Sequence, residues 1–149
     1  MDAKHINKTL KLKIEELVNL ELSKGVQPQE LSDNIINENY TKISLTRFLD
    51  KIQCEVEFTD TGFFDEIKSK YKYKYIYDKN FVLREIIVKK SKTEKIVWNK
   101  EEEEGKLLEE IILLMKKTMK QKEIDKFINS LSIELKSLYT KNNRFEGII

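Results

Sequence analysis

The chain has almost none of the residues that form disulfides or tight turns. Its 149 residues include one cysteine, one proline and four glycines. A lone cysteine cannot form an intramolecular disulfide, and so few glycines and prolines favour a chain dominated by regular structure. No apolar run approaches the roughly 20 residues of a membrane span, and the N-terminus lacks the apolar core of a signal peptide. We therefore expect a cytoplasmic protein without a membrane segment.

Residues that carry catalytic or metal chemistry are equally sparse. His5 is the only histidine, and one imidazole near a terminus is a poor basis for acid–base catalysis or a zinc site. Cys54 lies between a helix pattern and a strand pattern, where a free cysteine is usually a small buried hydrophobe. The side chains of Glu101–Glu104 point in different directions on a helix and cannot converge on one ion. None of the glycines forms a phosphate-binding loop. We predict no enzymatic activity, no cofactor and no metal.

The residues that are present favour one folded domain. Apolar residues make up 40% of the chain, too many for disorder, and a chain of this length buries roughly 70% of its unfolded surface. The apolar pattern changes from helical spacing to alternation at Cys54 and back again at Asn99. This predicts an α+β fold within a single domain, 1–149. Its predicted parts are a short-helix unit (1–53), a sheet (54–98), C-terminal helices (99–141) and a tail (142–149).

Helical spacing in the first part predicts three short helices. The first covers about 6–24 and is ended by Gly25, a residue that readily adopts the left-handed conformation beyond a last turn. Pro28 suits the first turn of the second helix. The third covers 44–52, where four apolar residues recur at helical spacing. These four are Leu45, Phe48, Leu49 and Ile52. Two helices flanking a short turn resemble a helix-turn-helix.

Alternation in the second part predicts an antiparallel meander of three or four strands. Its clearest strand is 71–77, where tyrosines alternate with lysines and one isoleucine. Polar breaks at 78–80 and 91–93 separate this strand from 81–90 and from 96–98. A short strand at 56–58 and a short helix at 61–67 are predicted to precede it. The tyrosines are predicted to be either core residues under a helical layer or a stacking platform for bases.

The strongest helix pattern lies in the third part. Asn99 followed by Glu102 forms a capping-box pattern, which predicts a helix start there. One apolar stripe runs from Leu107 to Met119, and a second from Ile124 to Leu138. The step of five residues between the stripes predicts a bend near 120–123. We expect this helical pair to cover the sheet with one edge and to form a homodimer with the other.

Charge is distributed unevenly along the chain. Residues 61–100 carry 11 Lys/Arg against 5 Asp/Glu, a balance of +6, whereas residues 1–60 carry 8 against 11, a balance of −3. A locally basic sheet is a candidate surface for phosphates or for an acidic partner. The alternative is that these lysines only solubilise exposed strands.

Two functional hypotheses follow. The first is a small DNA-binding regulator, in which a basic hairpin that resembles the wing of a winged-helix protein contacts the nucleic-acid backbone. The second is a protein interaction module or inhibitor that binds an acidic protein, in the style of phage and plasmid accessory proteins. The +6 segment favours the first, and the −3 N-terminal part counts against it. The predicted nucleic-acid contacts are Lys72, Lys74, Lys79, Arg84, Lys89, Lys90 and Lys92, with Arg47 on the third helix as a source of specificity.

Overall fold

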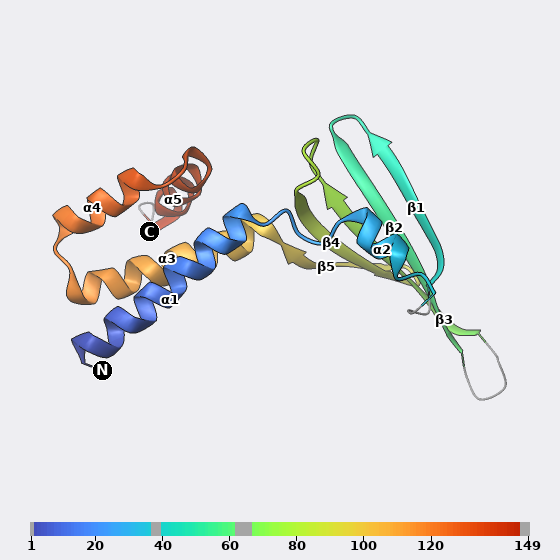
Figure 1. The fold of residues 1–149 in the computed structure, drawn as a ribbon, viewed down its shortest axis with the longest axis horizontal. Helices are drawn as coiled ribbons and strands as arrows, with labels where there is room; N and C mark the ends of the chain where they lie inside the picture. The colour runs from blue at the N-terminus through green and yellow to red at the C-terminus, as the bar shows by residue number, and fades with distance from the viewer. Residues whose placement is uncertain (1, 37–39, 62–66, 147–149) are drawn as a thin grey trace. The chain divides into compact units, whose positions relative to one another are not determined.

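The computed structural model of the chain describes residues 2–36, 40–61 and 67–146. The fold is α+β, as the sequence predicts, with an N-terminal helix, an antiparallel sheet and C-terminal helices (Figure 1). The chain forms two compact units, each of which is described by itself below. The sheet unit is 23–100, and the helical unit combines 1–22 with 101–149. The expectation of one domain stays a prediction.

The sheet is a five-stranded antiparallel meander in which each strand pairs with its neighbours in sequence, in the order β1-β2-β3-β4-β5. The prediction of a meander is confirmed, with five strands in place of the three or four expected. The strands are β1 (Tyr40–Phe48), β2 (Lys51–Thr61), β3 (Ile67–Tyr77), β4 (Leu83–Lys90) and β5 (Thr93–Asn99).

The predicted third helix is wrong, because 44–52 lies within β1 and β2 and in the two-residue turn between them. Leu45 pairs with Cys54, and Phe48 pairs with Lys51. The apolar residues there fit a helix of period 3.6, but they also fit two strands of period 2 once a turn is placed at 49–50. The helix-turn-helix prediction fails with this helix, and Arg47 lies on β1. The predicted short helix at 61–67 falls largely on residues outside the described ranges.

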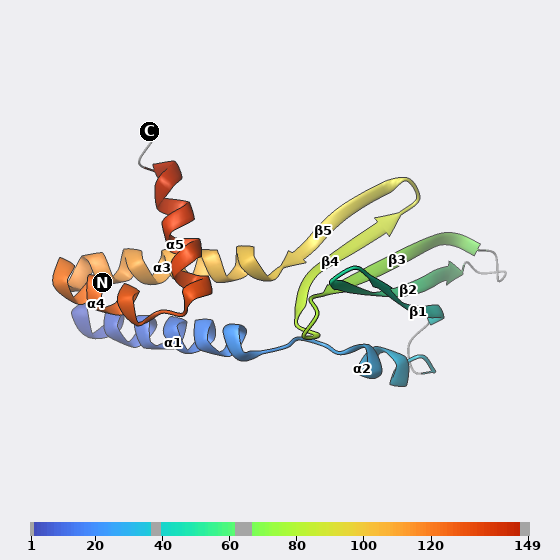
Figure 2. The ribbon, with the colours of Figure 1, turned by 90° about the horizontal axis from the view of Figure 1, so that it is seen from above.

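Helix α2 (Pro28–Asp33) contributes to the core of the sheet unit and lies beside β1 and β2 (Figure 2). Pro28 occupies its first turn, as predicted. Gly25 has a φ of 78°, which confirms the predicted left-handed conformation, although the preceding helix ends earlier, at Leu22. A Cβ at position 25 would lie 2.7 Å from the Cβ of Leu83, so this close approach requires glycine. The buried residues of this core are Leu31, Cys54, Val56, Tyr77 and Leu83.

Four helices lie in the described part of the helical unit. They are α1 (Ala3–Leu22), α3 (Lys100–Thr118), α4 (Gln121–Ser130) and α5 (Ile133–Glu146). Helix α3 begins directly after Asn99, as the capping pattern predicts, and the bend near 120–123 is confirmed by the start of α4. The predicted C-terminal pair is three helices, because the second stripe is interrupted at 131–132. The hydroxyl of Ser132 accepts the N–H of Leu135, which is the cap of a new helix. Helix α5 continues past residue 141, where we expected the tail to begin.

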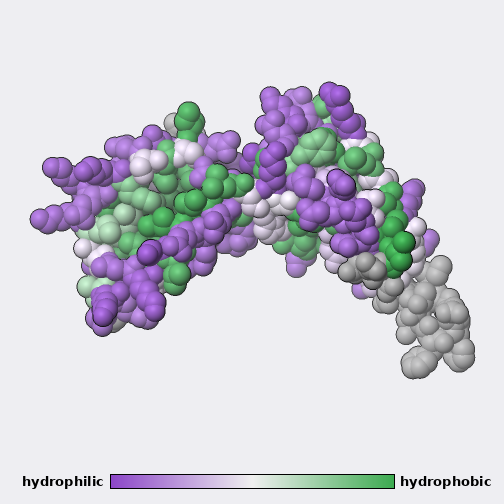
Figure 3. All heavy atoms as spheres, viewed as in Figure 1, coloured by the Kyte–Doolittle hydropathy of each residue, from purple (hydrophilic) through white to green (hydrophobic). Residues whose placement is uncertain are grey.

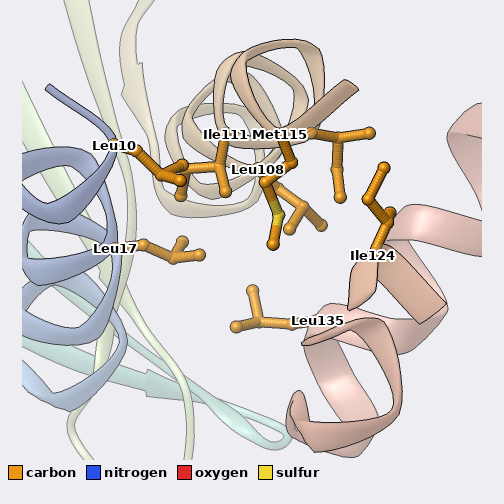
Figure 4. Packing of buried hydrophobic residues seen from close by; sticks show 8 residues of the cluster. Leu10, Leu17, Leu108, Ile111, Met115, Ile124 and Leu135 are labelled. Atoms are coloured by element: carbon orange, nitrogen blue, oxygen red, sulfur yellow. The ribbon is translucent and has the colours of Figure 1, made fainter. Parts of the chain in front are cut away.

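The core of the helical unit draws on all four helices (Figure 4). Leu10 and Leu17 of α1 meet the α3 stripe. The buried residues of this stripe pack against α1, α4 and α5, and the expectation that the stripe covers the sheet stays a prediction. The sequence did not show this arrangement, since α1 and α3 lie far apart along the chain. The homodimer stays a prediction. The remaining buried residues of the cluster are Leu108, Ile111, Ile112, Met115, Ile124 and Leu135.

Candidate functional site

The lysines predicted to contact phosphate fall on both faces of the sheet. Lys72, Lys74 and Lys89 share one face, which we call the lysine face, because Lys72 pairs directly with Lys89. The opposite face, the tyrosine face, carries the four tyrosines of β3. Lys90 belongs to the tyrosine face, since it pairs with Tyr71 and its Nζ lies 5.5 Å from the centre of that ring.

Carboxylates of neighbouring strands offset the charge of the lysine face. The Nζ of Lys72 lies 3.1 Å from a carboxylate oxygen of Glu57, and that of Lys74 lies 2.9 Å from one of Glu94. The hydrogen bond to Glu57 raises the pKa of Lys72, and the hydrogen bond from Lys74 lowers the pKa of Glu94. Exposed pairs of this kind stabilise little, but they reduce the positive potential that a phosphate would meet.

The remaining predicted contacts lie at opposite ends of the sheet. Lys92 is in the β4–β5 turn, whereas Lys79 is in the β3–β4 turn. A strand of eight residues such as β4 spans about 25 Å, so these two lysines cannot share one short ligand. Arg84 is held by an ion pair of 3.0 Å with Asp78. The structure therefore divides the predicted set into separate groups, one of which is the pair Arg47 and Lys79, beside the β1–β2 and β3–β4 turns.

The tyrosine face is packed against its neighbours. Tyr77 is fully buried, and its hydroxyl donates a hydrogen bond of 2.6 Å to the carbonyl oxygen of Val26. Tyr73 is half-buried and lies edge-on against Phe58, with ring centroids 5.2 Å apart. The ring of Tyr40 also lies edge-on against Phe58, with ring centroids 4.7 Å apart. The tyrosines were predicted to be either core residues or a stacking platform for bases. The burial of Tyr77 confirms the first alternative for this residue.

An apolar hollow of about 600 Å³ lies beside the β1–β2 and β3–β4 turns. This is within the size range of sites that bind small ligands or single side chains of a partner. Figure 3 shows apolar atoms at the sheet surface near these two turns, bordered by hydrophilic ones. We call this site the turn hollow, and its lining residues are Leu45, Arg47, Leu49, Asp50, Ile52, Lys79 and Phe81.

Two exposed side chains of the turn hollow are held in a strained backbone. Leu49 has a φ of 54° and Phe81 a φ of 60°, values that glycine adopts freely and bulky residues rarely adopt. Each costs about 1–2 kcal/mol relative to an unstrained residue. Leu49 is 79% exposed, so burial does not offset its strain, and this side chain is a candidate for a functional role. Phe81 is 40% exposed, and its ring centroid lies 6.3 Å from that of the buried Tyr77.

The turn that presents Phe81 is fixed by Asp78. Its carboxylate accepts hydrogen bonds from the N–H groups of Asn80, at 2.8 Å, and Val82, at 3.1 Å, and from Arg84 at 3.0 Å. Partial burial raises the pKa of Asp78, but these donors lower it by more, so the pKa lies below its usual value. The ionised carboxylate therefore stabilises the folded turn.

We expect Asp78→Asn to lower the free energy of unfolding at pH 7 by about 1–2 kcal/mol. Because the folded-state pKa is lowered, the contribution of the carboxylate is present above the unfolded pKa of about 3.9 and is lost as pH falls through the folded pKa. Urea titrations between about pH 7 and pH 2 will show the difference between wild type and variant shrinking towards zero. Asp50→Asn, which removes an exposed carboxylate in the β1–β2 turn, is the matched control, and we expect it to change the free energy of unfolding at pH 7 by less than about 0.5 kcal/mol. A constant difference at all pH values would contradict this role of Asp78.

A second hollow, of about 340 Å³, lies between α2 and β1 and shares Leu45 with the turn hollow. We call it the helix hollow. Cys54 lines it but is buried, and burial raises the pKa of its thiol, which disfavours the reactive thiolate. The hollow is lined by Pro28, Gln29, Ser32, Ile43, Ser44, Leu45 and Cys54.

The structure offers no arrangement for metal chemistry in the part of the chain that it describes. Within residues 2–36, 40–61 and 67–146, no three His, Cys, Asp or Glu side chains gather where they could hold a metal ion. None of the described helices has the length and apolarity that crossing a bilayer requires. The two hollows were not predicted, because Leu45 and Leu49 were assigned to a helix. The alternation of Ile43, Leu45 and Arg47 was the pattern from which an edge strand could have been predicted.

Comparison with known proteins adds no relative from which a role could be transferred. No family model, no curated protein and no solved structure matches this chain.

Proposed function

We propose that this chain is a non-enzymatic protein-binding module that recognises a partner through the turn hollow. The observation that carries the proposal is the pair Leu49 and Phe81, two exposed apolar side chains held in left-handed backbone at the border of one hollow. Apolar anchor pockets with a few charged groups at the rim are typical of the centres of protein interfaces.

The charges at the rim favour an acidic partner. Arg47 and Lys79 both line the turn hollow, and within the described ranges neither makes an ion pair. Asp50 is the single acidic side chain of the lining. A partner that places an apolar side chain in the hollow and a carboxylate near the two cations would satisfy both features.

The test is a selection of random 12-residue peptides, displayed on phage, against the purified protein. Peptides that bind the turn hollow should lose at least tenfold in affinity for Leu45→Asp, because a carboxylate then enters the apolar hollow beside an acidic ligand. The matched control is Ile96→Asp on β5, since Ile96 is 53% exposed and Leu45 is 58% exposed. The control should keep wild-type affinity. Equal binding to all three proteins would overturn the proposal.

Nucleic-acid binding is the second candidate, and the lysines around the β4–β5 turn favour it. Lys89, Lys90, Lys92 and Lys95 lie on or beside this turn. Under this alternative, affinity for random duplex DNA or single strands falls steeply with salt. Replacing Lys79, Lys89 and Lys90 by alanine would then weaken binding to all sequences and lower the salt slope by up to about 0.9 for each phosphate that is no longer neutralised. We expect no such salt-dependent binding at 50–200 mM salt, and its observation would make nucleic acid the ligand.

A further inference from the structure

Strand β1 forms one edge of the sheet. It is nine residues long, contains no proline and pairs only with β2 in the described sheet. Because a strand at an edge pairs on one side, about half of its N–H and C=O groups face away from the sheet and remain available for another strand. Natural edges are often short, or interrupted by proline or bulges, to prevent such pairing. Apart from an irregularity near Tyr40, β1 is regular along its length.

The two hollows follow the side-chain repeat of this edge. Ile43, Leu45 and Arg47 lie on the same face, because they pair with Val56, Cys54 and Ile52. Alternate residues of a strand are about 6.6–6.8 Å apart. The helix hollow is bordered by Ile43 and Leu45, and the turn hollow by Leu45 and Arg47. The hollows are therefore spaced along β1 as the alternate side chains of an added strand would be.

We propose that β1 takes up an extended segment of the partner as a sixth strand. This inference rests on the proposed function and specifies how the ligand is held. Main-chain hydrogen bonds to the outer edge of β1 give affinity, and two apolar side chains at alternate positions of the segment enter the two hollows. A carboxylate near the second apolar position faces Arg47 and Lys79, the two cations of the turn hollow, which make no ion pairs in the described part of the chain.

The opposite edge does not have the same features. Strand β5 also exposes apolar side chains, Ile96 and Val97, but neither the turn hollow nor the helix hollow is lined by a β5 residue. The acidic Glu94 of β5 is paired with Lys74. An added strand on β5 would have edge hydrogen bonds without these pockets, so β1 is the edge that combines backbone pairing with side-chain recognition.

The experiment uses the peptide that binds most tightly in the selection described above, made synthetically in two N-methylated forms. In one form the odd-numbered amides are methylated, and in the other the even-numbered amides. In an added strand, alternate N–H groups point to the edge and the others to solvent. We expect one form to lose at least tenfold in affinity and the other to change less than threefold. Hydrogen exchange should slow at the amides of β1 on peptide binding and stay unchanged at those of β5.

The outcomes separate this inference from the proposed function. A peptide whose binding is lost in Leu45→Asp, but whose two methylated forms bind alike and leave β1 exchange unchanged, overturns strand addition and leaves the surface around Leu45, which both hollows share, as the binding site. A peptide that binds Leu45→Asp as tightly as the wild type overturns both the proposed function and strand addition. A third peptide with lysine in place of each acidic residue tests the charge complementarity, and it should bind at least tenfold more weakly than the original at low salt.

Discussion

Replacing Leu108 by alanine will lower the free energy of unfolding by about 2–5 kcal/mol, measured by urea denaturation with far-UV circular dichroism. Leu108 is 1% exposed and belongs to the cluster in which α1, α3, α4 and α5 meet (Figure 4). Truncation removes its apolar packing and leaves a cavity that the neighbouring helices must close. The destabilisation is large because the surrounding leucines and isoleucines can relax only partly into the space.

Leu113→Ala is the matched control for this prediction. It makes the same chemical change on the same helix, α3, so helix propensity contributes equally, but Leu113 is 54% exposed. We expect a destabilisation below about 1 kcal/mol. Equal effects in the two variants would mean that the side of α3 bearing Leu108 does not face the core of the helical unit.

Replacing Tyr77 by alanine should cost the sheet unit about 3–5 kcal/mol, the range for truncation of a buried aromatic ring. Tyr77 is fully buried in the cluster that includes Leu31 of α2, and its hydroxyl donates to the carbonyl of Val26. Burial raises the pKa of this hydroxyl well above its usual range. Trp98, the only tryptophan, lies in β5, so urea denaturation followed by its fluorescence reports on the unit that the substitution affects.

Tyr77→Phe separates the ring from the hydroxyl. It keeps the packing of the ring and removes one hydrogen bond, so the expected destabilisation is about 1 kcal/mol. If the phenylalanine variant were destabilised as much as the alanine variant, the hydrogen bond to Val26 and not the packing of the ring would dominate. The same traces test the predicted single domain, since one cooperative unit would give the same midpoint by fluorescence and by circular dichroism.

Elements whose sequence pattern excludes alternatives were predicted well. The tyrosine strand alternates over seven residues, and the start of α3 carries both a capping residue and an acidic first turn. The failure at 44–52 has a definite physical cause. Short apolar patterns fit both periods, and the turn that decides between them, Leu49–Asp50, lacks the glycine or asparagine that normally marks a two-residue hairpin turn. Pairing along the whole of β1 outweighs the strain at Leu49.

Less of the candidate site than of the fold could be predicted from the sequence. Arg47 and Lys79 were both predicted as ligand contacts, but as parts of different elements and for a nucleic acid. Their meeting at the turn hollow depends on the register of three strands, in which Arg47 is opposite Ile52 and Ile52 is opposite Tyr77. The ion pairs that occupy Lys72 and Lys74 depend on the same kind of register. Composition shows that lysines are present, whereas cross-strand pairing determines which of them carry uncompensated charge.

The division of the helical unit between the two ends of the chain has a consequence for biosynthesis. Helix α1 leaves the ribosome before β1–β5, and its core partners in α3 follow only after these strands, a delay of several seconds at about 5–20 residues per second. An isolated helix of this length is marginally stable in water, so Leu10 and Leu17 stay without their partners during this interval. The meander, whose hairpins form between neighbouring strands, can fold in the meantime. The sheet is therefore expected to fold first, and the helical unit to close around α1 only when synthesis has passed α3.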